Sequence, residues 1–165
     1  MKKIFLLLCV TALLSSCATI KLPTTTEPAT VVFTDSNMCV EKPFSASINE
    51  DSLIEIAGKG FVLQSGAGNI KIYWQTVGVS DPFNGQLVIE PNLCINGTDF
   101  CIIGQYFIRV RQNSLTDMLK QGMTFGTSSV SIFVYYYNER LTAIPKVCIK
   151  TAQTSAVAKY KSLKK

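Results

Sequence analysis

Short apolar runs separated by turn signals recur along the chain and constrain its fold more than any other feature. The longest of them is 129–137, in which β-branched and aromatic residues predominate. Short strands at this spacing predict an antiparallel β-sandwich or a partly open β-barrel, so we expect a mainly β domain over 31–150. The other predicted strands are 31–33, 44–48, 70–77, 86–90, 93–95, 100–103, 105–111 and 141–150.

Three places in this β-rich domain depart from regular strand patterning. One short helix is predicted near 114–121, where Ser114 can cap the first turn and Gly122 can close the last. The segment 51–57 fits either a short helix or a strand, and we favour the strand. Pro145 lacks an N–H donor, which predicts that the last strand lies at a sheet edge or carries a bulge.

The first residues form a basic, an apolar and a small-residue stretch in succession. Lys2 and Lys3 precede the apolar-rich stretch 4–14, and Ser15 and Ser16 follow it. A helix over 4–14 would be about 16 Å long, whereas the hydrocarbon core of a membrane is about 30 Å thick. This order of stretches therefore indicates a cleaved signal peptide over 1–16 rather than a membrane span.

Leu14-Ser15-Ser16-Cys17 resembles the lipobox of bacterial lipoproteins. The resemblance implies cleavage before Cys17 and a covalent lipid on its sulfur that attaches the protein to a membrane; no other cofactor is expected. Ala18 resembles the residue of lipoproteins that are sent to the outer membrane. The expected location is thus the cell envelope, on an outer-membrane anchor facing the periplasm, with surface exposure or an ordinary secretory signal as alternatives.

Two segments flank the predicted domain and lack apolar periodicity. The threonine- and proline-rich stretch 17–30 is expected to be an extended tether, and 151–165 a flexible tail rich in lysine. The chain carries 16 basic and 11 acidic side chains, but six of the lysines lie in the signal peptide or in the last seven residues. The remaining body is nearly neutral, which argues against nucleic acid as a partner. Contact of the tail with anionic lipid is the alternative.

Four of the six cysteines remain once Cys9 is removed with the signal peptide and Cys17 is assigned to the lipid, an even number in an exported protein. If 96–99 forms a four-residue hairpin loop, Cys94 lies opposite Cys101 at a distance that suits a disulfide. Cys39 and Cys148 then form a second disulfide that ties the first strand region to the last. A zinc site is disfavoured because the chain has no CxxC pair, and unpaired buried thiols are the other alternative.

The chain contains no histidine. This excludes Ser-His-Asp and Cys-His nucleophiles, histidine general bases and histidine-based zinc sites. The carboxylates of Glu90 and Asp99, or of Glu50, Asp51 and Glu55, are interpreted as solvated residues of turns and strand edges rather than as a glycosidase pair. No catalytic residue and no metal site is predicted, and we expect a protein that is not an enzyme.

Aromatic side chains are concentrated on the predicted strand 129–137. Phe133, Tyr135 and Tyr137 share one face of it, and Tyr136 lies on the other. Our first interpretation is that all of them pack within sheets. If instead Tyr136 and Tyr106 face outward, they form a binding surface that suits a protein or a glycan.

These patterns lead to three hypotheses about function. The first is a membrane-anchored, non-enzymatic envelope lipoprotein whose β-domain binds another protein, for example as an accessory part of a secretion system. The second is a surface lipoprotein that binds a ligand or glycan, and the third is a structural or receptor-blocking envelope lipoprotein. The secretion and receptor-blocking roles are expectations from the lipoprotein class, not from residues of the domain.

Overall fold

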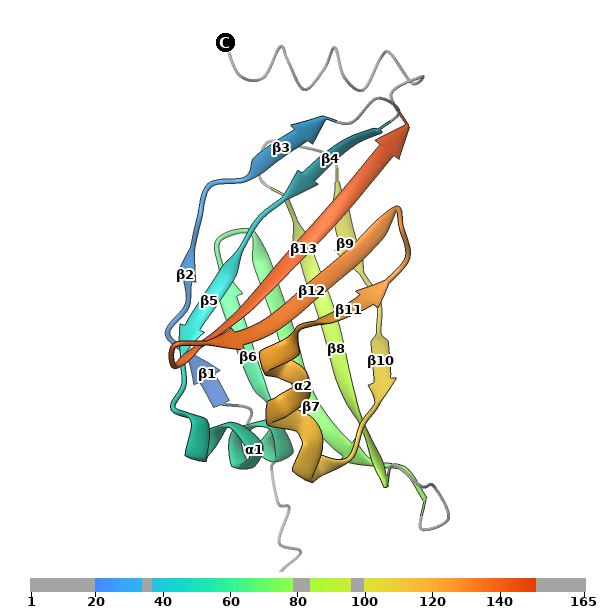
Figure 1. Cartoon of the computed structure of the whole chain (residues 1–165). Coiled ribbons are helices and arrows are strands. Elements are labelled where there is room, and N and C mark those ends of the chain that lie inside the picture. Colours follow the sequence, from blue (N-terminus) through green and yellow to red (C-terminus); the bar gives the residue numbers. More distant parts are fainter. Residues whose placement is uncertain (1–19, 34–36, 79–83, 96–99, 151–165) are drawn as a thin grey trace, which may run out of the picture.

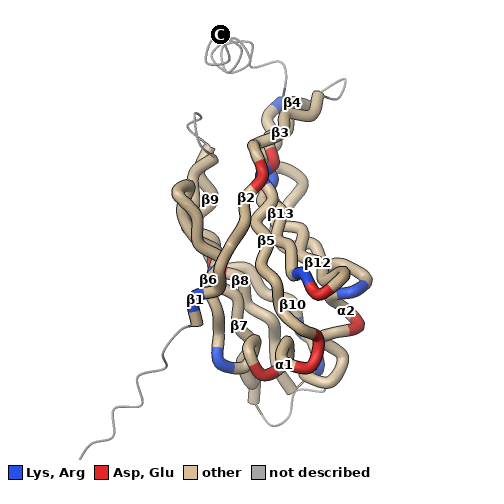
Figure 2. The backbone as a smooth tube through the Cα atoms, turned by 90° about the vertical axis from the view of Figure 1, so that its left-hand side faces the viewer, with Lys and Arg blue, Asp and Glu red and all other residues tan. Residues whose placement is uncertain are grey.

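The structure is a computed structural model that describes residues 20–33, 37–78, 84–95 and 100–150 (Figure 1). Within these residues a six-stranded sheet, sheet A, packs on a seven-stranded sheet, sheet B (Figure 2). The hydrophobic core lies between the two sheets, and no closed barrel forms in the described part of the chain. The predicted β-sandwich is therefore confirmed.

Sheet A has the strand order β1-β6-β7-β8-β10, with β9 beside β8. β1 runs parallel to β6, and all the other neighbours are antiparallel. Its strands are β1 (Ile20–Leu22), β6 (Phe61–Ser65), β7 (Gly68–Thr76), β8 (Gly85–Cys94), β9 (Cys101–Ile103) and β10 (Tyr106–Arg109).

Sheet B has the order β11-β12-β13-β4-β3, and β5 and β2 extend it beside the other half of β13. All of its strand pairs are antiparallel. Its strands are β2 (Thr25–Thr26), β3 (Thr30–Phe33), β4 (Asn37–Glu41), β5 (Phe44–Ser47), β11 (Met123–Gly126), β12 (Val130–Tyr137) and β13 (Arg140–Lys150).

Side chains alternate along these strands between the core and the outside. On β12, Ile132 and Val134 are fully buried, whereas Phe133 and Tyr137 are exposed. This is the period of two that a strand imposes when one face of its sheet is covered. The largest fully buried side chains include Phe44, Phe61 and Phe125.

The strand favoured over 51–57 is wrong, because α1 (Glu50–Lys59) is a helix. The Asn49 side chain accepts a hydrogen bond from the Ser52 backbone N–H at 2.9 Å and caps it. Leu53 and Ala57, one helical turn apart, are the residues that α1 buries. The spacing of these two apolar contacts outweighs the β-branched residues that suggested a strand.

The helix predicted near 114–121 is confirmed as α2 (Leu115–Gln121), preceded by a short 3-10 turn, η1 (Gln112–Ser114). α2 buries Leu115 and Leu119. Both helices lie toward one end of the sandwich (Figure 1). An ion pair between Lys120 of α2 and Glu50 of α1 joins them.

β13 lies in the interior of sheet B, so the edge position expected from Pro145 is wrong. On the side of β13 away from β12, the neighbouring strand is interrupted instead. Lys146 pairs with Glu41 of β4 and Ala143 with Phe44 of β5, without a change of register. The Lys42 N–H donates to the Pro145 carbonyl at 3.2 Å. Since the N–H and C=O of one strand residue point to the same neighbour, the missing donor of proline faces this interruption.

β8 of sheet A accommodates its own proline in the same way. Pro91 lies opposite Gly104, in the break between β9 and β10, and its carbonyl accepts the Gly104 N–H at 3.4 Å. The register is again continuous across the break. Each sheet thus contains one long interior strand with a proline, and a partner strand that is divided opposite it.

Residues 20–30 do not form the tether that was expected over 17–30. β1 pairs with β6, and β2 pairs with β5. Ile20 and Leu22 are half-buried against the core, which explains why this stretch joins the sheets instead of extending into solvent. The first part of the predicted tether, 17–19, lies outside the described residues.

Candidate functional site

Both predicted disulfides are present, Cys94–Cys101 and Cys39–Cys148. Each joins directly opposed residues of neighbouring antiparallel strands, with Cα atoms 4.0 Å apart. The Ile95 N–H donates to the Phe100 carbonyl at 2.8 Å. This is the pairing that a loop of residues 96–99 requires, although these residues themselves lie outside the described part.

Tyr106 and Tyr136, the alternative binding surface if they faced outward, both point toward the core. Tyr136 is only 3% exposed, and its hydroxyl donates to the Ile48 carbonyl at 2.9 Å. Tyr106 is half-buried and packs against the core from the opposite sheet. The two side chains therefore form no outward surface, because alternation directs Phe107 of β10 and Tyr137 of β12 outward instead.

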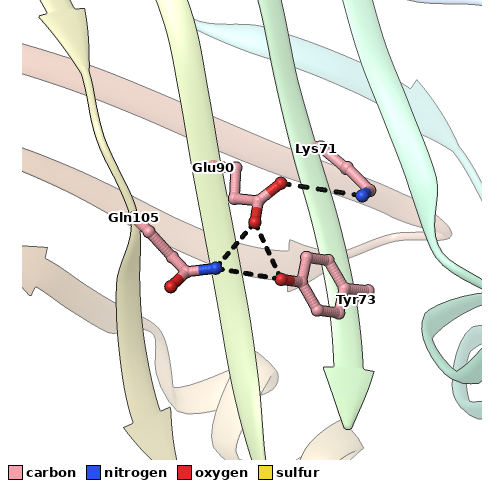
Figure 3. A network of polar contacts seen from close by, with 4 residues as sticks. All are labelled: Lys71, Tyr73, Glu90 and Gln105. Atoms are coloured by element: carbon pink, nitrogen blue, oxygen red, sulfur yellow. Dashed lines mark hydrogen bonds and ion pairs between the residues drawn. The ribbon is translucent and has the colours of Figure 1, made fainter.

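The outer face of sheet A carries a polar cluster made by Lys71, Tyr73, Glu90 and Gln105 (Figure 3). Glu90 lies on the interior strand β8, and the Tyr73 hydroxyl donates to its Oε1 at 2.8 Å. The Gln105 side-chain amide donates to the same oxygen at 2.7 Å. Lys71 lies 3.6 Å from Oε2 and over the Tyr73 ring, 4.8 Å from its centroid. Glu90 is thus not the solvated strand-edge residue that was expected.

Register explains how these residues meet. Lys71 lies opposite Glu90 on β7, and Gln105 lies opposite Glu90 on the other side, in the break between β9 and β10. Tyr73 is two residues along β7 on the same face. The interruption beside Pro91 therefore places Gln105, a residue outside regular strand structure, within hydrogen-bond distance of Glu90 at the centre of the cluster.

The electrostatics of the cluster follow from its hydrogen bonds. The hydrogen bond from the Tyr73 hydroxyl has the largest effect and lowers the pKa of Glu90. Burial, the next largest effect, raises this pKa, and the hydrogen bond from Gln105 and the charge of Lys71 lower it further. Burial and the nearby Glu90 carboxylate raise the pKa of Tyr73. At neutral pH the cluster therefore holds an ionised carboxylate and a neutral phenol in fixed positions.

Two exposed apolar side chains flank the cluster, one at the end of β9 and one on β10. Ile103 is 70% exposed and Phe107 is 58% exposed, two residues before and two residues after Gln105. All three share the outer face of sheet A. We call the set Tyr73, Glu90, Ile103, Gln105 and Phe107 the sheet A surface. Exposed apolar side chains beside a pre-arranged polar centre are one arrangement from which protein-binding surfaces are built.

The sequence pattern did not single out the sheet A surface. Phe107, Arg109 and Arg111 alternate with Tyr106, Ile108 and Val110. Arg109 and Arg111 share a strand face with Phe107, and their charges were the signal in the sequence that Phe107 faces solvent. No sequence signal predicted the cluster around Glu90, because its members come from three separate segments.

Several other predicted features lie outside the described residues: Cys17 and the signal peptide, Asp99, and the tail 151–165. Among the described residues, no group of three or more His, Cys, Asp or Glu side chains is arranged to hold a metal ion. Nor does this part of the chain contain a helix with the length and apolarity that crossing a membrane requires.

Comparison of the chain with protein-family models, with curated proteins and with solved structures finds no match.

Proposed function

We propose that this protein is a lipid-anchored, non-enzymatic protein of the bacterial cell envelope whose β-sandwich binds another protein. The observation that carries the binding role is the sheet A surface, where Ile103 and Phe107 are exposed on either side of the Glu90 cluster. Burying large apolar side chains around satisfied polar groups is what stabilises protein complexes.

The export part of the proposal is supported by the cysteines. Two disulfides that pair all four cysteines of the described residues indicate an oxidising compartment such as the periplasm or the cell surface. The signal-like stretch 1–16 and the lipobox-like Leu14-Ser15-Ser16-Cys17 agree with that compartment.

The fold also changes where the domain would sit relative to a lipid on Cys17. Only residues 18 and 19 separate Cys17 from β1, and the Ile20 N–H donates to the carbonyl of Gly60, at the end of α1. Three extended residues span about 10 Å. The proposed anchor therefore holds the C-terminal end of α1 close to the membrane surface, instead of letting the domain stand far from it.

The anchor is tested by metabolic labelling with a fatty-acid analogue in a bacterial host that processes lipoproteins. The wild-type chain should incorporate the label and fractionate with membranes, and Cys17→Ala should lose both properties. Labelling that persists in Cys17→Ala would refute the lipid on this residue, and a Cys9→Ala variant serves as the matched control.

The binding role is tested by a photo-crosslinking amino acid at position 103 in the native host. We expect a discrete crosslinked protein whose yield falls at least fivefold when Phe107→Ala is added. Phe133→Ala, which removes a partly exposed phenylalanine from the opposite sheet, should leave the yield unchanged. A yield insensitive to Phe107→Ala, or equally sensitive to Phe133→Ala, would rule out the sheet A surface as the binding site.

A further inference from the structure

The outer face of sheet B contains a hollow of about 430 Å³ near the turn between β12 and β13. Its lining residues are Ser47, Tyr135, Tyr137, Asn138, Glu139, Arg140 and Thr142. A second hollow of about 210 Å³ adjoins it through two shared residues, Ser47 and Arg140, and reaches the segment 23–25 that enters β2. Together they form a groove across one end of sheet B.

Strand register builds the groove from two parallel rows of side chains. Tyr137 lies opposite Arg140, and Arg140 lies opposite Ser47. The next row on the same face contains Tyr135, Thr142 and Ser45. Two rows across three strands span about 7 Å by about 10 Å, the size of one or two sugar rings.

The aromatic side of the groove is both exposed and held in place. Tyr137 is 69% exposed, at the end of β12. The Tyr135 ring stacks on Phe133, with centroids 5.5 Å apart, and Phe133 in turn lies over Gly122. A Cβ at Gly122 would meet the Phe133 ring at 2.4 Å, so the glycine is what permits this close packing. Aromatic rings fixed on a strand offer flat apolar faces to a ligand.

The polar side of the groove offers donors and acceptors in near balance. Arg140 is exposed and forms no ion pair or side-chain hydrogen bond within the described residues, so its guanidinium donors face the groove unpaired. Glu139 contributes one carboxylate to the same lining. The hydroxyls of Ser45 and Thr142 are paired at 3.0 Å. One positive and one negative group leave no net charge, which disfavours a phosphate or a polyanion as the ligand.

From this lining we infer that the groove binds a neutral oligosaccharide. The tyrosine rings pack against the C–H faces of a sugar, and Arg140, Glu139 and Ser47 hydrogen-bond to its hydroxyls. The groove lies on the sheet opposite the sheet A surface, so it is a second site that does not depend on the proposed protein partner or on the lipid anchor.

The inference is tested with the purified full chain and a panel of neutral hexasaccharides: β-1,3-glucan, β-1,4-glucan, α-1,4-glucan, β-1,4-mannan and chitin oligomers. Polygalacturonate and anionic phospholipid vesicles serve as charged probes, and binding is measured by titration calorimetry. We expect at least one neutral oligomer to bind. For that oligomer Tyr137→Ala should lower the affinity at least tenfold, and Tyr137→Phe less than threefold, because the ring is retained.

Phe107→Ala is the matched control, since it removes an exposed aromatic ring from sheet A, and it should leave sugar affinity unchanged. Tyr137 is exposed, and near-ultraviolet circular dichroism of its variants verifies that they fold. Failure of every neutral oligomer to bind at millimolar concentration would overturn the inference, as would tighter binding of a charged probe or equal binding by Tyr137→Ala. None of these outcomes bears on the crosslinking result at position 103.

Discussion

At the scale of single residues, neighbouring side chains of the same type have opposite roles. Tyr136 is buried, and its hydroxyl is paired with the Ile48 carbonyl, whereas Tyr137 is the most exposed tyrosine of β12. The first fastens the end of β12 to the residue that precedes the cap of α1. The second is free to contact a ligand. Strand alternation alone produces this division.

The Tyr136 hydroxyl can be tested by a conservative change. Tyr136→Phe leaves the Ile48 carbonyl buried without its donor, and we expect the free energy of unfolding to fall by about 1–3 kcal/mol. Tyr137→Phe, at an exposed position, should change it by less than about 0.5 kcal/mol. Urea unfolding of both variants provides the comparison, and equal effects would contradict the role assigned to the buried hydrogen bond.

Glu90 should make stability depend on pH on the acid side. Its pKa is lower in the folded protein than its ordinary value near 4.5. A carboxyl group of this kind stabilises the fold fully above its unfolded pKa, and that contribution is lost as pH falls through the folded pKa. Glu90→Gln should therefore show a shallower loss of stability below pH 4.5 than the wild type, measured by urea unfolding at a series of pH values.

Glu55 provides the comparison for this pH effect. Its pKa is also lowered, by the hydrogen bond and charge of Lys59, but the pair is exposed. Salt screens exposed pairs strongly, so the effect of Glu55→Gln should disappear at high salt while that of Glu90→Gln persists. Identical salt dependence of the two variants would indicate that the Glu90 cluster is solvated in the same way.

At the scale of elements, the residues at the ends of a segment decide its secondary structure more than the residues in its interior do. The segment 50–59 contains enough β-branched residues to suit a strand, yet Asn49 and Gly60 delimit it as a helix. In the same way, Pro91 and Pro145 do not displace β8 and β13 from the sheet interior. Each proline lies opposite a break in one neighbouring strand. Because the regular ladder is interrupted at that point, the missing N–H of the proline removes no hydrogen bond from it.

The cap of α1 gives an element-scale prediction. Asn49→Ala removes the hydrogen bond to the Ser52 N–H and should lower the free energy of unfolding by about 1 kcal/mol. Ser114 occupies the corresponding position of α2 but makes no capping hydrogen bond through its side chain. Ser114→Ala should therefore have a smaller effect in the same thermal or urea unfolding experiment, and the opposite order would be inconsistent with the cap.

At the scale of the whole molecule, two disulfides close loops of very different length. Cys39–Cys148 joins residues 109 apart in the sequence, and Cys94–Cys101 joins residues 7 apart. The long loop encloses both helices and all of sheet A except β1. It therefore restricts most of the unfolded chain, whereas the short loop restricts only one hairpin.

The two bridges should consequently differ in their contribution to stability. On the chain-entropy model they contribute about 4.8 and about 2.5 kcal/mol respectively. The double variant Cys39→Ser/Cys148→Ser should thus lose about 2 kcal/mol more than Cys94→Ser/Cys101→Ser in urea unfolding. Equal losses would mean that strain or residual structure in the unfolded chain outweighs loop length.

The amino-acid sequence by itself determined the features that depend on neighbours in the chain. The β-branched and aromatic residues over 129–137 predicted the strand, and the spacing of Cys94 and Cys101 around a four-residue loop predicted a disulfide. Only the tertiary structure decided which face of each strand is covered, because alternation separates two sets of side chains without saying which one meets the opposite sheet. It also decided that 50–59 is a helix, that Ile20 and Leu22 join sheet A, and that Glu90 meets Tyr73 and Gln105, since each depends on a contact between distant segments.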